Sequence, residues 1–94
     1  MSYDLLVKGG TVIDPYQGLN GVYDIGFKNG KVSRITKSIS EKESSEICYA
    51  TNLIVSPGLI DLHVHSFWGA ASYGIQPDVA NLSQGVTTAL DAGT

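Results

Sequence analysis

Several residue types and patterns are scarce in this chain, and each scarcity excludes a class of protein. The single cysteine, Cys48, cannot form a disulfide within the chain, which is typical of a reducing compartment. No apolar run approaches the roughly 18 residues that a membrane span needs. Six Lys and Arg face nine Asp and Glu, and no basic run exists. We therefore expect no nucleic-acid partner and no membrane partner.

The N-terminal residues and the overall composition exclude two further classes of protein. The first residues lack a basic segment followed by an apolar core, so no signal peptide is expected, and we predict a cytoplasmic protein. The 94 residues are 43% hydrophobic and 16% charged. This balance is ordinary for a packed globular chain and excludes intrinsic disorder.

Residues 1–55 have the pattern of a small β-rich domain. Alternating residues from Tyr3 onward predict a first strand, and runs at 22–27 and 31–35 predict two more. Asn29-Gly30 separates these two runs, and this dipeptide favours a type I′ hairpin because both central residues need a positive φ. The spacing of apolar residues in the second run suggests a bulge or a strand end.

The remaining features of this part are interpreted as turns and loops. Gly9-Gly10 is expected to form a turn. The polar stretch 38–46 offers almost nothing to bury and is predicted to be a solvated loop. Cys48, which precedes an apolar strand, is interpreted as a small core residue rather than a nucleophile.

Residues 56–94 have a different pattern, that of a β–α–β unit. A buried strand is predicted at 59–64, a short helix from Pro77 to Gly85, and a second strand at 86–90. Strands joined through a helix are parallel with a right-handed crossover. The predicted fold is therefore a β-rich N-terminal part followed by the beginning of an α/β domain.

The sharpest chemical pattern is Asp61-Leu62-His63-Val64-His65, which contains both histidines of the chain. On a strand, residues two apart point to the same face, so His63 and His65 are expected side by side, with Asp61 next to them. Two imidazoles on one face suit a zinc-like ion. The alternative from spacing alone is a pair of surface or hydrogen-bonded core histidines.

Residues 50–65 resemble the entry into the barrel of the amidohydrolase superfamily, metal-dependent hydrolases that include dihydroorotases, hydantoinases, adenine deaminases and deacetylases. Residues 3–14 are similar to the first strands of the small β-sandwich domain that precedes the barrel. Residues 85–94 look like the second barrel strand. The Pro-Gly-x-Ile-Asp-x-His-x-His core of the match is specific. The resemblance implies half of a β-sandwich at 1–55 and an incomplete (β/α)₈ TIM barrel at 56–94.

The resemblance also implies roles for particular residues. His63 and His65 match the two histidines that bind the more buried metal, in a centre of one or two divalent ions, zinc being the expected metal. Asp61 matches a carboxylate near that metal. The alternative, a hydrogen-bond acceptor at the strand end with no part in metal binding, is weighted equally. Trp68 and Tyr73 lie in the loop that would rim the active site, where packing of the loop is the alternative to substrate contact.

One departure from the family pattern bears on the backbone. Asn52 stands where the family often has glycine, and because asparagine tolerates the left-handed conformation we expect the turn to survive. The remaining metal ligands and the proton-shuttle aspartate of the family would lie on later strands. No catalytic residue is therefore assigned, and the 94 residues alone are expected to be inactive.

Three hypotheses follow. The first is the N-terminal part of an amidohydrolase that uses metal-activated water to cleave a C–N or ester bond of a small molecule, homo-oligomeric in its full-length form. The second keeps the superfamily but makes the reaction deamination of a purine-like ring. The third is a free-standing β-rich binding or oligomerising module with structural histidines.

Overall fold

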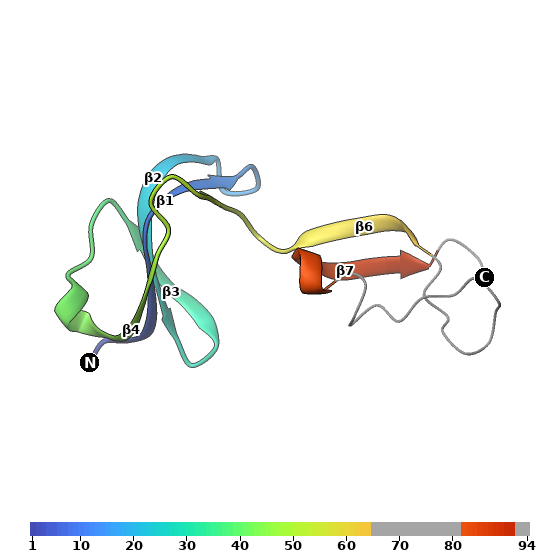
Figure 1. Ribbon diagram of the computed structural model, residues 1–94. Helices are drawn as coiled ribbons and strands as arrows, with labels where there is room; N and C mark the ends of the chain where they lie inside the picture. Colours follow the sequence, from blue (N-terminus) through green and yellow to red (C-terminus); the bar gives the residue numbers. More distant parts are fainter. Residues whose placement is uncertain (65–81, 92–94) are drawn as a thin grey trace. The chain divides into compact units, whose positions relative to one another are not determined.

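The computed structural model describes residues 1–64 and 82–91, and it divides the chain into two units, Met1–Pro57 and Gly58–Thr94 (Figure 1). The elements are β1 (Tyr3–Asp14), β2 (Leu19–Lys28), β3 (Lys31–Thr36), the 3-10 turn η1 (Glu41–Glu43), β4 (Ser44–Tyr49), β5 (Ile54–Val55), β6 (Leu59–Val64), the 3-10 turn η2 (Leu82–Gln84) and β7 (Val86–Asp91). Strands dominate the described residues of both units. Among these residues, no helix is long and apolar enough to cross a membrane.

The first unit is a five-stranded sheet in the order β3-β2-β1-β4, with β5 also paired to β1. β1, β2 and β3 are antiparallel, whereas β4 and β5 run parallel to β1. The predicted solvated loop at 38–46 is therefore wrong in its second half, because Ser44 begins β4. Burial of Ser44 and partial burial of Ile47 are sufficient to place this polar segment on the sheet edge.

The hairpin between β2 and β3 is confirmed. Asn29 and Gly30 have φ of 54° and 75°, the positive values that a type I′ turn needs. The irregularity expected in the second strand is a bulge: Gly26 pairs with Arg34 and Phe27 with Val32, so Ser33 has no partner of its own. A bulge of this kind increases the local twist of the strand.

Gly9-Gly10 does not form the predicted turn, because β1 continues through both residues with a shift in register. Gly9 has a φ of +78° and Gly10 lies 2.5 Å from Val55 Cγ2, measured from the position that a Cβ would take. The two glycines therefore allow a β-bulge in the middle of a long strand and the close approach of β5.

Asn52 adopts a φ of 65° in the turn between β4 and β5, which confirms its left-handed conformation. Leu53 N donates to Ala50 O at 2.9 Å across this turn, and Thr11 N donates to Leu53 O at 2.9 Å. The turn lets the chain leave β4 and rejoin β1 as β5.

The core of the first unit is small. Tyr3, Leu6 and Ile39 form its centre, and Ile47 packs against them. Gly26 leaves room for the Tyr3 ring, whose Cδ1 lies 2.6 Å from the place a Cβ would occupy. Cys48 is exposed, so its interpretation as a core residue is wrong: it alternates with Ile47 on an edge strand, and neighbouring residues of a strand face opposite ways.

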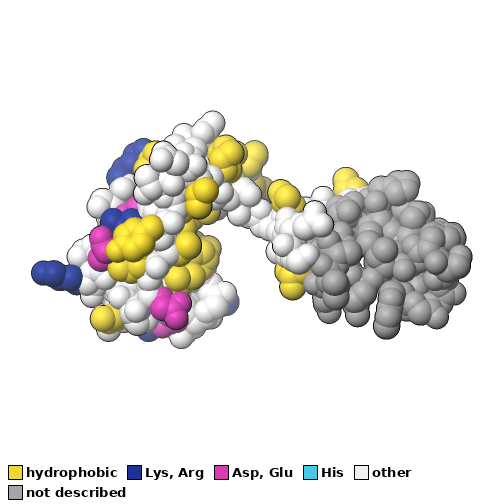
Figure 2. Space-filling view, viewed as in Figure 1, with side chains coloured by type: hydrophobic (Ala, Val, Ile, Leu, Met, Phe, Trp, Pro, Cys, Tyr) yellow, Lys and Arg dark blue, Asp and Glu magenta, His cyan; other side chains and the backbone are white. Residues whose placement is uncertain are grey.

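The second unit pairs β6 with β7 in parallel, as predicted, with the expected start and end of β6. The expectation of burial is wrong in this chain: Leu59, Ile60 and Leu62 are 55%, 62% and 69% exposed. Hydrophobic side chains are accordingly visible at the surface of the described residues (Figure 2). Of the predicted helix from Pro77 to Gly85, residues 77–81 lie outside the described residues, Leu82–Gln84 form the 3-10 turn η2, and Gly85 is a turn residue.

Candidate active site

β6 and β7 form the backbone frame on which the predicted site residues lie. Gly58 precedes β6, and a Cβ there would collide with the Thr87 side chain. Gly85 precedes β7 with a φ of +86°, and its carbonyl accepts from Leu59 N at 2.9 Å. The two glycines thus allow the strands to start together at close range.

Asp61 and His63 occupy alternate positions of β6, which ends at Val64. His65 follows at once but lies outside the described residues, as do Trp68 and Tyr73. The roles of these five residues remain predictions. Among the residues that the structure describes, no group of three or more His, Cys, Asp or Glu is placed to hold a metal ion.

The register of the two strands brings another acidic residue to the same end. Asp61 pairs with Ala89, and Val64 pairs with Asp91, with an irregularity between the two pairs. Asp91 is the last residue of β7, so the carboxyl ends of both strands lie together. Carboxyl ends of parallel strands are where α/β sheets and barrels carry their active sites.

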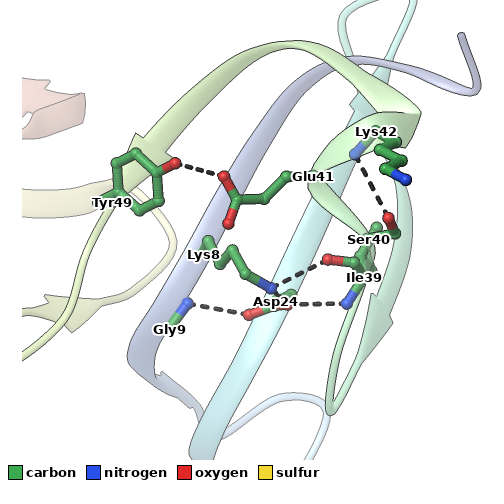
Figure 3. A network of polar contacts seen from close by, with 8 residues as sticks. All are labelled: Lys8, Gly9, Asp24, Ile39, Ser40, Glu41, Lys42 and Tyr49. Carbon is green, nitrogen blue, oxygen red and sulfur yellow. Dashed lines mark hydrogen bonds and ion pairs between the residues drawn. The ribbon is translucent and has the colours of Figure 1, made fainter.

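The first unit holds a buried carboxylate, Asp24, that sequence reasoning missed. Lys8 Nζ lies 2.7 Å from Asp24 Oδ2, and the Asp24 side chain is 4% exposed (Figure 3). Burial raises the pKa of Asp24, but hydrogen bonds from Lys8, Ile39 N and Gly9 N outweigh it, so that the pKa lies below its usual 3.8. Polar residues within β1 and β2 gave no local signal of this pairing, because 16 residues separate them.

A second polar pair lies on the surface of the same unit. The Tyr49 hydroxyl donates to Glu41 Oε1 (Figure 3), and this hydrogen bond raises the pKa of Tyr49 above its usual 10.0. Because the pair is exposed, it offers no enclosed site and is assigned no chemistry.

Comparison with known proteins gives relatives of consistent type, although no family model matches the chain. A dihydroorotase of Geobacter metallireducens is 48% identical over 62 residues, which are 66% of this chain and 15% of that protein. A deacetylase of Enterococcus faecalis is 39% identical over 95 aligned residues, covering 100% of this chain and 24% of that protein. The chain therefore spans about a quarter or less of these relatives.

Solved structures agree with these relatives. An adenine deaminase superposes with a TM-score of 0.78 and 37% identity, over 98% of this chain and 24% of that one. An N-acyl-D-glutamate deacylase from Bordetella bronchiseptica, solved with zinc and a phosphonate inhibitor, gives 0.73 and 28% identity over 95% of this chain and 18% of that one.

Proposed function

The chain belongs to the amidohydrolase superfamily, of whose members it spans the N-terminal region, and from this premise we propose that it is the opening part of a metal-dependent hydrolase. The proposed reaction is hydrolysis of an amide, cyclic amide or ester bond of a small molecule by activated water. The observation that carries the proposal is the match of nearly the whole chain to a deacetylase and an adenine deaminase.

The donors of β6 and of the residue that follows it in the sequence fit a zinc-like ion in part. His63 and His65 each offer a neutral imidazole nitrogen, and Asp61 stands two positions before the first histidine. A catalytic zinc takes about three protein ligands and keeps one position open. The two histidines would therefore hold the ion together with ligands from strands beyond this chain.

A divalent ion held there would lower the pKa of a water molecule to about 7. The chain's own residues have the supporting tasks. His63 and His65 fix the position of the ion, and Asp61 accepts a ring N–H and so holds the tautomer that leaves the other nitrogen free. Trp68 and Tyr73, which follow β6 in the sequence, are proposed to contact the substrate.

The exposed strand residues support the view that the second unit is the start of a larger barrel. Leu59, Ile60 and Leu62 are more than half exposed, and exposed apolar residues in such a group are unusual in a finished domain. A complete (β/α)₈ barrel takes about 250 residues. The 94 residues alone are accordingly proposed to be inactive.

Deamination of a purine-like ring is the second candidate, favoured by the TM-score of 0.78 with an adenine deaminase. The two reactions share the activated water and differ in the leaving group. An assay of the protein that carries this chain with N-acetylated compounds, cyclic amides and adenine distinguishes the two reactions. Release of acetate or of a ring-opened acid supports hydrolysis of an amide, and release of ammonia from adenine supports deamination.

The intact mass of the protein isolated from its source tests the proposal that the chain is part of a longer enzyme. A mass several-fold above 10.0 kDa is expected, and sedimentation then reports whether it is the homo-oligomer we propose. A concentration-independent mass of 10.0 kDa with a cooperative melt would instead support a free-standing binding module.

The test of the residues uses single alanine substitutions of His63 and His65 in that longer protein. We expect both to lower kcat by roughly 10²-fold or more, since loss of a ligand removes the activated water. Gln84→Ala, an exposed polar residue of η2, is the control and should leave kcat unchanged. Unchanged rates in both histidine variants would contradict the assignment.

A further inference from the structure

Residues 37–43, which we call the strap, join β3 to β4 and contain η1, drawn in green in Figure 1. Ile39 is the one buried residue of the strap, 1% exposed, and it belongs to the core cluster with Tyr3 and Leu6. The strap is not a strand of the sheet, so the backbone groups of Ile39 need partners from outside the strand ladders.

Both backbone groups of Ile39 are bound by one ion pair. Ile39 N donates to Asp24 Oδ2 at 2.8 Å, and Ile39 O accepts from Lys8 Nζ at 3.0 Å (Figure 3). Lys8 Nζ also donates to Asp24 Oδ2 at 2.7 Å, and Gly9 N donates to Asp24 Oδ1 at 2.9 Å. The last bond uses an amide in the bulge of β1, where Gly9 has its positive φ.

The other polar contacts of the strap lie at or near the surface. Lys37 Nζ, on an exposed residue, lies 4.2 Å from the centroid of the Tyr23 ring. Glu43 accepts from Ser2 Oγ at 3.3 Å, Glu41 accepts from Tyr49, and Ser40 Oγ accepts from Lys42 N at 3.4 Å within the strap. Solvent-exposed polar contacts contribute little to stability. Attachment of the strap is therefore concentrated at Ile39.

Loss of the Lys8 ammonium would leave a buried charge without its counter-charge. The Asp24 carboxylate, which is 4% exposed, would keep its two backbone donors, Ile39 N and Gly9 N, and the Ile39 carbonyl would lose the donor Lys8 Nζ. Breaking a buried pair in this way is more costly than the pair was favourable. The antiparallel strands do not share this dependence, because the β1–β2 ladder has eight residue pairs and β2–β3 closes through a two-residue turn.

We propose that Lys8 and Asp24 act as a charge lock on the strap, and that without the lock the strap and β4 leave the sheet together while β1, β2 and β3 stay paired. β4 follows the strap directly and is held along one side by β1. Opening would uncover Tyr3 and Leu6 and free the edge of β1 from Tyr3 to Lys8. The lock thus controls access to a pairing edge, which is the part of a sheet most prone to bind another strand.

Hydrogen exchange of the chain, resolved by residue, tests the lock. Ile39 N reports on the strap, and Ala50 N, which donates to Lys8 O at 2.8 Å, reports on the end of β4. In Lys8→Met and Asp24→Asn, both amides should exchange roughly tenfold faster or more, while the amides of β1 and β2 keep their protection.

The control is the exposed ion pair of the same two strands. Lys28 Nζ lies 3.3 Å from Asp4 Oδ1, with side chains 42% and 57% exposed. Lys28→Met removes the same charge from this pair and should change no amide by more than about twofold. Lys8→Arg keeps the charge and the donors, and it should retain most of the protection that Lys8→Met loses.

Each outcome of the exchange experiment either supports the charge lock or contradicts it. Faster exchange confined to the strap and β4 in Lys8→Met, with protection restored in Lys8→Arg, supports the lock. Three results would overturn it: unchanged exchange at Ile39 and Ala50, uniform loss of protection that includes β1 and β2, or loss in Lys8→Arg as large as in Lys8→Met. A Lys8→Met chain that does not fold at all counts as uniform loss of protection and would also overturn the lock.

Discussion

Ile39 fills the centre of a very small core, and its truncation is the most demanding test of the packing. Ile39→Ala removes three carbon atoms from a side chain that is 1% exposed and contacts the cluster of Tyr3 and Leu6. At about 0.8 kcal/mol per buried carbon, the transfer loss is about 2.4 kcal/mol. A cavity contribution brings the expected cost to about 3 kcal/mol, within the usual range of about 2–5 kcal/mol for this change.

Ile54 supplies a matched control for the same substitution. It lies in β5 and is 72% exposed, so Ile54→Ala removes the same atoms without opening a cavity. Its expected cost is below about 1 kcal/mol, which covers loss of a β-branched residue from a strand. Urea unfolding of both variants, followed by far-UV circular dichroism, gives the two differences in the free energy of unfolding.

The reasoning is refuted if Ile39→Ala costs no more than Ile54→Ala. That result would mean that the strap does not pack on the sheet in solution. A difference of about 2 kcal/mol or more in the expected direction is a large fraction of the stability of a small domain, and it would support the core as described.

Three further predictions concern a close approach, a turn and a charge. Gly26→Ala places a methyl group against the Tyr3 ring and should lower the free energy of unfolding by about 1–3 kcal/mol, measured by urea unfolding; a neutral result would contradict the packing of the ring. Asn29→Val puts a β-branched residue at a φ of 54° and should cost about 1–3 kcal/mol in the same assay, whereas Asn29→Gly should cost little. Because the pKa of Asp24 lies below 3.8 in the folded chain, its contribution to stability is fully present above pH 3.8 and disappears as the pH falls through the folded value. Thermal unfolding between pH 2 and pH 6 should therefore show a smaller acid dependence for Asp24→Asn than for the unsubstituted chain, and equal slopes would refute this.

Local signals in the sequence predicted the backbone conformation correctly at positions where one or two residues determine it. Asn29-Gly30 predicted the hairpin, and Asn52 predicted the left-handed turn, because few residues accept a positive φ. The bounds of β6 followed from its apolar residues Leu59, Ile60, Leu62 and Val64 and from the preceding Pro57-Gly58.

Features that depend on residues far apart in the chain were not predictable in the same way. β4 appeared to be a loop because Ser44, Ser45 and Glu46 are polar, and an edge strand needs little burial to form. Gly9 resembled a turn residue because a bulge and a turn use the same positive φ. The contact of Lys8 with Ile39 O spans 31 residues, so no local pattern announces it.

For the candidate site, the structure tests the strand position of two residues, and the metal chemistry stays a prediction. The Asp-x-His-x-His spacing lies where expected for its first two members, Asp61 and His63, which occupy alternate positions of β6. The approach of Asp91 to the end of β6 depends on the register with β7, and register follows from pairing rather than from the sequence of one strand.

Metal analysis of the intact protein that carries this chain tests the central claim most directly. The unsubstituted protein should contain at least one equivalent of a divalent ion, zinc in the first place, after exhaustive dialysis. The double variant His63→Ala/His65→Ala should contain markedly less, while Gln84→Ala should retain the full amount. Metal content that is unchanged in the double variant would contradict the assignment of these histidines and, with it, the account of the site.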